Sequence, residues 1–71
     1  MNYECVSARF FFWNGQQAFT VEYTYVSSTW YVFKDEGKTD ALFVKKVAST
    51  KLINRWIAED VLMVYLNTII T

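Results

Sequence analysis

The side chains that perform most enzyme chemistry are scarce in this sequence. Its 71 residues include no histidine and a single cysteine, Cys5. A thiol acts as a nucleophile when a base lies beside it, and a chain without histidine can build neither a Ser–His–Asp nor a Cys–His arrangement. We therefore predict a protein without enzymatic activity, in which Cys5 is a small apolar filler on a strand.

Metal and cofactor sites are not expected either. One thiol without imidazole ligands cannot complete a zinc site, and the two glycines lie too far apart for a phosphate-binding loop. Glu59 and Asp60 are adjacent, which on a helix points them about 100° apart. The other clustered carboxylates share one predicted loop, at Asp35, Glu36 and Asp40. This loop lacks the alternating ligands of an EF-hand, so we interpret it as a solvated turn and predict no metal and no cofactor.

Aromatic side chains make up 20% of the chain and are the residues best suited to binding. In the expected sheet, one arginine and four aromatic residues project from the face that lies away from the core: Arg9, Phe11, Trp13, Tyr31 and Phe33. Aromatic side chains contribute strongly to protein interfaces, and a row of them beside a cation could also stack unpaired bases. A second candidate protein-binding surface lies on the C-terminal helix, at Leu62, Met63, Tyr65 and Leu66.

The first two strands of the expected sheet are joined by Asn14-Gly15. This dipeptide is a strong signal for a two-residue hairpin turn, in which both central positions need positive φ. With that turn, Phe10 faces Phe19 on the core side of the sheet. On the opposite side Arg9 lies diagonal to Glu22. A slip of one residue would mix the two faces, so the alternation supports the hairpin.

A third strand follows if Ser27-Ser28 form another tight turn. Serine is poorly suited to positive φ, so a longer loop is an alternative. In the simple register Tyr23 faces Val32 on the core side. A charged, glycine-containing segment from Asp35 ends the strand. Because aromatic and β-branched residues dominate this half, the sequence predicts a three-stranded antiparallel β-meander over about 3–34.

The second half of the chain has apolar residues three and four apart, as helices do. For residues 41–48 we favour a helix capped by Asp40, because Lys45 and Lys46 break the alternation of a strand, but a fourth strand is left open. A longer helix is predicted over about 50–67. Its core-facing stripe is expected to contain Ile53, Trp56, Ile57, Val61 and Val64.

These elements predict one α+β domain over 1–71, a β-meander packed by one or two C-terminal helices. Beyond Asp60 the longer helix is apolar on nearly every side, and such a helix is normally buried all round. So short a chain has few elements with which to cover it. Each candidate surface has a structural alternative. The helix over 41–48 or a second copy covers the sheet face, and the C-terminal helix packs between the sheet and a neighbouring helix.

Apolar residues make up 54% of the chain, more than one sheet–helix interface can cover, and this favours association. We therefore predict a non-enzymatic protein-binding module, an inhibitor or adaptor that occupies a surface of a larger protein machine. Virus-encoded blockers of host defences are an analogy from size and build alone. The expected partner is another protein, a second copy, or both, and its identity stays open. The alternatives are a single-stranded nucleic-acid binder that uses the outer aromatic residues, and a structural subunit of a homo-oligomer.

The charge balance and the apolar runs indicate where the protein works. A formal net charge of zero gives no electrostatic reason to bind nucleic acid or an anionic membrane. No apolar run approaches the roughly 20 residues of a transmembrane helix, and Glu4 stands where a signal peptide carries positive charge. The single cysteine has no intrachain disulfide partner. We therefore expect a soluble, cytoplasmic protein.

Overall fold

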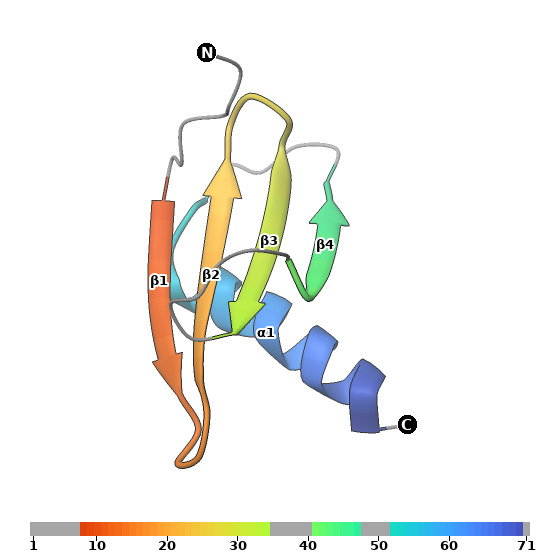
Figure 1. Cartoon of the computed structure of the whole chain (residues 1–71). Coiled ribbons are helices and arrows are strands. Elements are labelled where there is room, and N and C mark those ends of the chain that lie inside the picture. Colours follow the sequence, from red (N-terminus) through yellow and green to blue (C-terminus); the bar gives the residue numbers. More distant parts are fainter. Residues whose placement is uncertain (1–7, 35–40, 48–51, 71) are drawn as a thin grey trace.

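Four strands and one helix make up the part of the chain that the computed structural model describes, residues 8–34, 41–47 and 52–70. In chain order these elements are β1 (Ala8–Trp13), β2 (Ala18–Thr24), β3 (Thr29–Lys34), β4 (Phe43–Lys46) and α1 (Arg55–Ile70). The strands form one antiparallel sheet in the order β1-β2-β3-β4, and α1 crosses behind it (Figure 1). The predicted α+β class is confirmed, but the sheet has four strands rather than three.

The turn between β1 and β2 lies one residue later than predicted. Residues 14–17 separate the two strands, and the N–H of Asn14 donates to the carbonyl oxygen of Gln17 at 3.2 Å. The side-chain Oδ1 of Asn14 accepts hydrogen bonds from the backbone N–H groups of Gln16, at 2.9 Å, and Gln17, at 2.8 Å. Gly15 takes a φ of 98°, a left-handed value that glycine adopts without steric cost. The side chain of Asn14 therefore stabilises a turn centred on Gly15 and Gln16 instead of Asn14 and Gly15.

Because the turn is displaced by one residue, each residue of β1 pairs with a residue of β2 two positions from its predicted partner. Phe10 pairs with Val21 instead of the predicted Phe19, and Arg9 stands directly opposite Glu22. Side chains alternate between the faces of a sheet with a period of two, so a shift of two residues leaves each side chain on its predicted face. The predicted partners are wrong, while the predicted division into a core face and an outer face agrees with the structure.

The turn between β2 and β3 occupies residues 25–28. Ser28 takes a left-handed φ of 51°, and its N–H donates to the carbonyl oxygen of Tyr25 at 3.3 Å. A tight turn of the predicted kind needs positive φ at both serines, so the longer loop that the sequence left open is the one that forms. Tyr23 accordingly pairs with Trp30, again two residues from its expected partner.

The prediction of a helix over 41–48 is wrong, because the described part of that segment contains β4. Phe43 pairs with Val32, and the N–H of Leu42 donates to the carbonyl oxygen of Val32 at 2.7 Å. A helix this short is marginal without tertiary support, whereas a strand satisfies the backbone groups along the edge of β3. Lys45 hides the alternation of apolar and polar residues that is typical of a strand. It projects to the side of the sheet on which the helix packs, where an apolar residue is expected, but at the edge its side chain is exposed.

α1 begins at Arg55 rather than near residue 50. Asn54 caps it, since its Oδ1 accepts a hydrogen bond from the N–H of Ile57 at 2.9 Å. The carbonyl oxygen of Asn54 accepts the first helical bond, from the N–H of Ala58 at 3.0 Å. Asparagine is among the best residues at this position, because its side chain satisfies a donor that the first turn leaves unpaired.

The core lies between α1 and one face of the sheet. Trp30 and Tyr23 stand at its centre, with ring centroids 4.9 Å apart. Phe10, Phe12 and Phe43 pack around it from the two edge strands. The buried apolar residues of this core are Phe19, Val21, Tyr23, Trp30, Val32, Ala58, Val61 and Leu62. No described helix or strand packs on the outer face of the sheet.

The face of α1 that packs on the sheet differs from the predicted stripe. Ala58, Val61 and Leu62 are buried, whereas Trp56 and Val64 are exposed. The helix is apolar on nearly every side, so the periodicity of the sequence left its rotation undetermined. The predicted stripe is right at Val61, and at Ile53 and Ile57, which pack against the core, and it is wrong at Trp56 and Val64.

Candidate protein-binding surface

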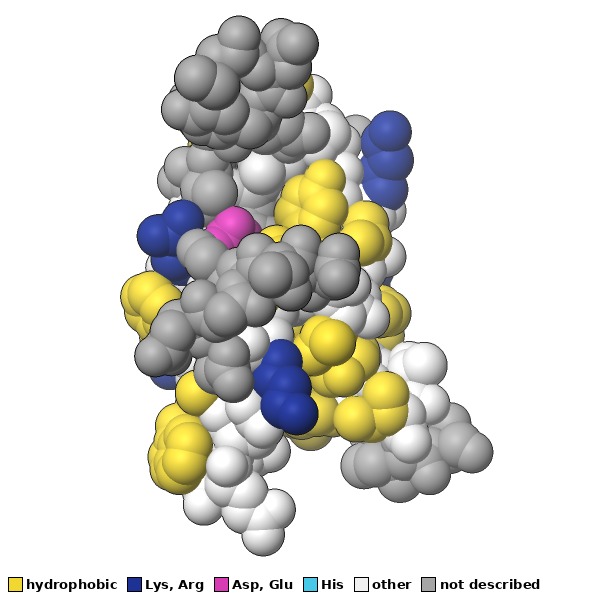
Figure 2. Space-filling model, in the orientation of Figure 1, with side chains coloured by type: hydrophobic (Ala, Val, Ile, Leu, Met, Phe, Trp, Pro, Cys, Tyr) yellow, Lys and Arg dark blue, Asp and Glu magenta, His cyan; other side chains and the backbone are white. Residues whose placement is uncertain are grey.

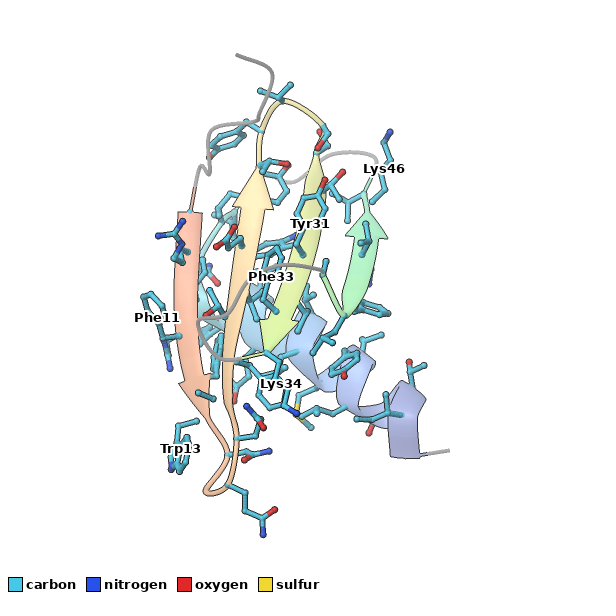
Figure 3. All side chains as sticks on the ribbon, viewed as in Figure 1. Phe11, Trp13, Tyr31, Phe33, Lys34 and Lys46 are labelled. Atoms are coloured by element: carbon cyan, nitrogen blue, oxygen red, sulfur yellow. The ribbon has the colours of Figure 1, made fainter. Side chains whose placement is uncertain are left out.

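The outer face of the sheet carries aromatic side chains from β1 and β3 (Figure 3). Phe11 and Trp13 of β1 are 63% and 67% exposed. Tyr31 and Phe33 of β3 are half-buried, and their rings are stacked with centroids 6.2 Å apart and planes 25° apart. Phe11 and Phe33 both stand opposite Thr20 of β2, so they share its face. The structure thus brings the four predicted aromatic residues to one side of the sheet.

An ion pair lies beside these rings, on the same face. Nε of Arg9 donates to Oε2 of Glu22 at 2.9 Å. Glu22 is buried and Arg9 is exposed, so the arginine supplies a positive charge to a carboxylate that has lost most of its water. A buried carboxylate is costly unless it is paired and hydrogen-bonded. The pair therefore places little net charge in the middle of this face.

Val44 extends the apolar part of this face onto β4. It is exposed and stands directly opposite Tyr31. Val44 is not among the predicted residues, because residues 41–48 were interpreted as a helix. In the structure Phe43 and Val44 project to opposite sides of the sheet, as neighbouring residues of a strand do. Figure 2 shows apolar side chains reaching the surface at several places on this side of the molecule. We call the following set the outer-face surface: Phe11, Trp13, Tyr31, Phe33 and Val44.

One lysine of the described residues shares the face of the outer-face surface. Lys46 stands opposite Thr29 on that face, whereas Lys34 ends β3 opposite Phe19 and so belongs to the helix side (Figure 3). Both are exposed, and neither forms an ion pair with another residue in the described ranges. The β4 side of the surface is therefore positive at Lys46.

The second predicted surface, on the C-terminal helix, is largely not a surface. Leu62 is 6% exposed and belongs to the core. Tyr65 and Leu66 are half-buried and pack against the core, and the ring of Tyr65 lies 5.8 Å from that of Phe43. Met63, at 47% exposed, is the member of the set that faces solvent. The expectation of an outward-facing group is wrong because α1 is rotated relative to the predicted stripe.

The exposed side of α1 carries a residue that the sequence analysis had placed in the core. Trp56 is 80% exposed, and it belongs to α1, which packs on the face of the sheet opposite the outer-face surface (Figure 1). Its neighbour Arg55 points to β1, where Nη2 donates to the carbonyl oxygen of Phe11 at 2.8 Å. The guanidinium carbon of Arg55 also lies 4.3 Å from the centroid of the Phe12 ring. The start of the helix is thus tied to the edge strand.

Within the described ranges, no three His, Cys, Asp or Glu residues lie close enough together to hold a metal ion. Glu59 and Asp60 are exposed on α1. Cys5 and the acidic loop lie outside the described residues, so their predicted roles stay predictions. In the same ranges, no helix has the length and hydropathy that crossing a bilayer requires.

Comparison with known proteins supplies no template for this surface. No protein family, curated protein or solved structure matches the chain. The function proposed below therefore depends on the geometry and exposure of the outer-face surface.

Proposed function

We propose that the protein is a non-enzymatic protein-binding module that occupies a surface of a larger protein, as an inhibitor or an adaptor. The exposure of Phe11 and Trp13, 63% and 67%, carries this proposal. Both stand on one strand and on the face opposite the core, so packing within the described part of the fold does not account for them. Adjacent exposed apolar side chains on a small protein mark an interaction site.

The energy available from these two side chains suits a protein interface. Burying an aromatic side chain of this kind contributes on the order of 2 kcal/mol, which is the scale of an interface hot spot. Aromatic rings also lose little conformational entropy on binding, since each side chain has two rotatable bonds. Because Arg9 already pairs with Glu22, a partner need not bury an unpaired carboxylate.

The proposal also includes the compartment. The single cysteine offers no intrachain disulfide, and no apolar run is long enough for a membrane anchor. We infer that the protein is a soluble module of the cytoplasm. A folded protein in cell lysate is therefore the appropriate form of partner to test.

The test is affinity capture from lysate with three forms of the full chain: wild type, Trp13→Ala and Trp56→Ala. The two variants form a matched pair, since each removes an exposed tryptophan, one from each side of the molecule. We expect Trp13→Ala to reduce recovery of the bound protein by about tenfold or more, because a hot-spot side chain contributes 2 kcal/mol or more. Trp56→Ala should recover the same protein in wild-type amount.

Two results would count against the proposal. If Trp13→Ala recovers the same partner in the same amount as wild type, the outer-face surface is not the contact. If Trp56→Ala loses the partner and Trp13→Ala does not, the binding side is the exposed face of α1. Unfolding curves of the three proteins should be alike, since both tryptophans lie outside the core.

A second candidate function, binding of single-stranded nucleic acid, gains support from the contact between Arg9 and Glu22. The carboxylate would repel phosphates if it were unpaired, and Arg9 neutralises it at 2.9 Å. Stacked Tyr31 and Phe33 offer ring surface, and Lys46 supplies charge on the same face. Salt-dependent retention on single-stranded DNA or RNA favours this function, and no retention at low salt removes it.

A structural role in a homo-oligomer is the remaining alternative. It predicts that the isolated protein associates through the outer-face surface without any other partner. Light scattering decides this: a monomer at micromolar concentration excludes the alternative, whereas a dimer that Trp13→Ala dissociates supports it.

A further inference from the structure

β1 is one of the two edge strands of the sheet (Figure 1), and alternate backbone groups along an edge strand point away from its neighbour. The N–H of Asn14 donates to the carbonyl oxygen of Gln17 at 3.2 Å, which makes this the first hydrogen-bonded pair of the ladder. Hydrogen-bonded and non-hydrogen-bonded pairs alternate along antiparallel strands. Arg9, Phe11 and Trp13 are therefore non-hydrogen-bonded positions, and their N–H and C=O groups face the open edge.

One side chain from α1 reaches this edge. Nη2 of Arg55 donates to the carbonyl oxygen of Phe11 at 2.8 Å. Among the described residues, no other side chain or strand bonds to the outward backbone groups of Arg9, Phe11 and Trp13. Within the same part of the chain, Arg55 has no carboxylate partner. The edge thus combines open backbone groups with a guanidinium that has no carboxylate partner among the described residues.

The two edges of the sheet differ in how they are protected. β4 is four residues long and ends in Lys45 and Lys46, and a short edge strand with lysines discourages further pairing. β1 is six residues long, and its sequence ARFFFW has one charged residue, Arg9, which is paired with Glu22. A long, apolar edge strand readily accepts another strand. β1 is therefore the edge suited to binding.

We propose that β1 is a strand-addition site that binds an extended, acidic segment of a partner protein. This inference rests on the proposed function and specifies how the partner engages the protein. The backbone of the added strand bonds to the outward groups of Arg9, Phe11 and Trp13. Its side chains on the outer face lie against Phe11 and Trp13, and a carboxylate pairs with Arg55. A carbonyl oxygen has two lone pairs, so Phe11 can keep its bond to Arg55 while it joins the new ladder.

Charge complementarity at Arg55 distinguishes this occupant from a second copy of the chain. An antiparallel pair of β1 strands would bring no carboxylate from β1 to Arg55, because the charged residue of that strand is Arg9. It would instead bring the Arg55 guanidinium groups of both copies to one seam, and like charges oppose pairing. The edge therefore fits an acidic segment from another protein better than its own copy.

The test is selection of random linear peptides, displayed on phage, against the immobilised full chain. We expect the enriched peptides to alternate apolar residues with at least one acidic residue. They should bind Trp13→Pro about tenfold more weakly than Trp13→Ala, the loss of roughly one backbone hydrogen bond in a formed ladder. Both variants remove the indole, but only proline removes the outward N–H, and at an edge position facing away from β2 it costs no ladder bond.

A test on the wild-type protein covers the case in which Trp13→Pro does not fold. The selected peptides are resynthesised in two versions, with N-methyl groups on the odd-numbered or on the even-numbered amides. One version should lose binding to wild type and the other should keep it, because only one set of amides faces β1. Conversion of the acidic residue of the peptide to its amide should weaken binding to wild type by about tenfold, and should have little effect on binding to Arg55→Gln.

Several outcomes would overturn strand addition. Strand addition is excluded if no peptide is enriched, or if the enriched peptides are basic. It is also excluded if the selected peptides bind Trp13→Pro and Trp13→Ala equally and still bind wild type after N-methylation of either set of amides. Self-association of the protein through β1 would identify a second copy as the occupant instead. These failures are separable from failure of the proposed function, since loss of a captured protein in Trp13→Ala tests the aromatic side chain and not the backbone N–H.

Discussion

Arg9 and Glu22 show how one contact changes the character of a surface. As a sequence feature, Glu22 is an isolated acid among aromatic residues, and it counts against an anionic partner. In the structure, Nε of Arg9 lies 2.9 Å from its Oε2, so the carboxylate is paired. The sequence placed these residues on the correct face but diagonal to one another, because it could not reveal that the Asn14 side chain bonds two backbone N–H groups in a turn centred one residue later.

At this scale, Arg9→Met should lower the free energy of unfolding by about 1 kcal/mol, since the guanidinium bonds a buried carboxylate but is itself exposed to screening water. Urea denaturation of wild type and variant measures the difference. Lys46→Met is the matched control, because it removes a cation on the same face that forms no ion pair among the described residues. The control should change stability by less than about 0.5 kcal/mol. Equal effects of the two substitutions would show that the ion pair is not stabilising.

Among the elements, the strands were predictable where alternation was clear, and the boundaries were not. The faces of β1, β2 and β3 follow from a period of two, which survives a register error of two residues. For β4, adjacent Lys45 and Lys46 concealed the alternation, since one of them lies on the side of the helix but at an exposed edge. The start of α1 was misplaced because Asn54 was interpreted as a helical residue, whereas its side chain caps the helix.

The cap at Asn54 gives a prediction for the helix. Asn54→Ala should destabilise the protein by about 1 kcal/mol, because the N–H of Ile57 loses its acceptor at the helix start. Asn54→Ser is the control, since serine is an equally good capping residue and should leave stability within a few tenths of a kcal/mol, about the spread among good caps. The free energy of unfolding in urea measures both. A loss of equal size in Asn54→Ser would contradict a capping role.

For the molecule as a whole, the sequence could not decide which side of α1 packs on the sheet. A helix that is apolar nearly all round has no preferred face until it meets the side chains of a particular sheet. The candidate set at Leu62, Met63, Tyr65 and Leu66 was therefore assigned outward, and most of it lies inward. The aromatic set on the sheet was placed on the correct face, because a strand offers two sides and the other side was already assigned to the core.

Leu62 and Met63 are adjacent on α1 but differ in burial. Leu62 is 6% exposed and Met63 is 47% exposed. Leu62→Ala should destabilise the protein by about 2–4 kcal/mol, since it removes buried methyl groups and leaves a cavity. Met63→Ala should change stability by less than about 1 kcal/mol, because its side chain remains largely in water. Thermal or urea unfolding compares the two. A larger loss in Met63→Ala than in Leu62→Ala would mean that α1 is rotated differently.

The central claim is that a partner protein binds the outer-face surface at Phe11 and Trp13. Photo-crosslinking tests it most directly, with p-benzoylphenylalanine replacing Phe11 in one preparation and Trp56 in another, each irradiated in lysate. We expect a discrete adduct between the chain and one protein from position 11, and no matching adduct from position 56. An adduct with the same protein from position 56 alone would contradict it.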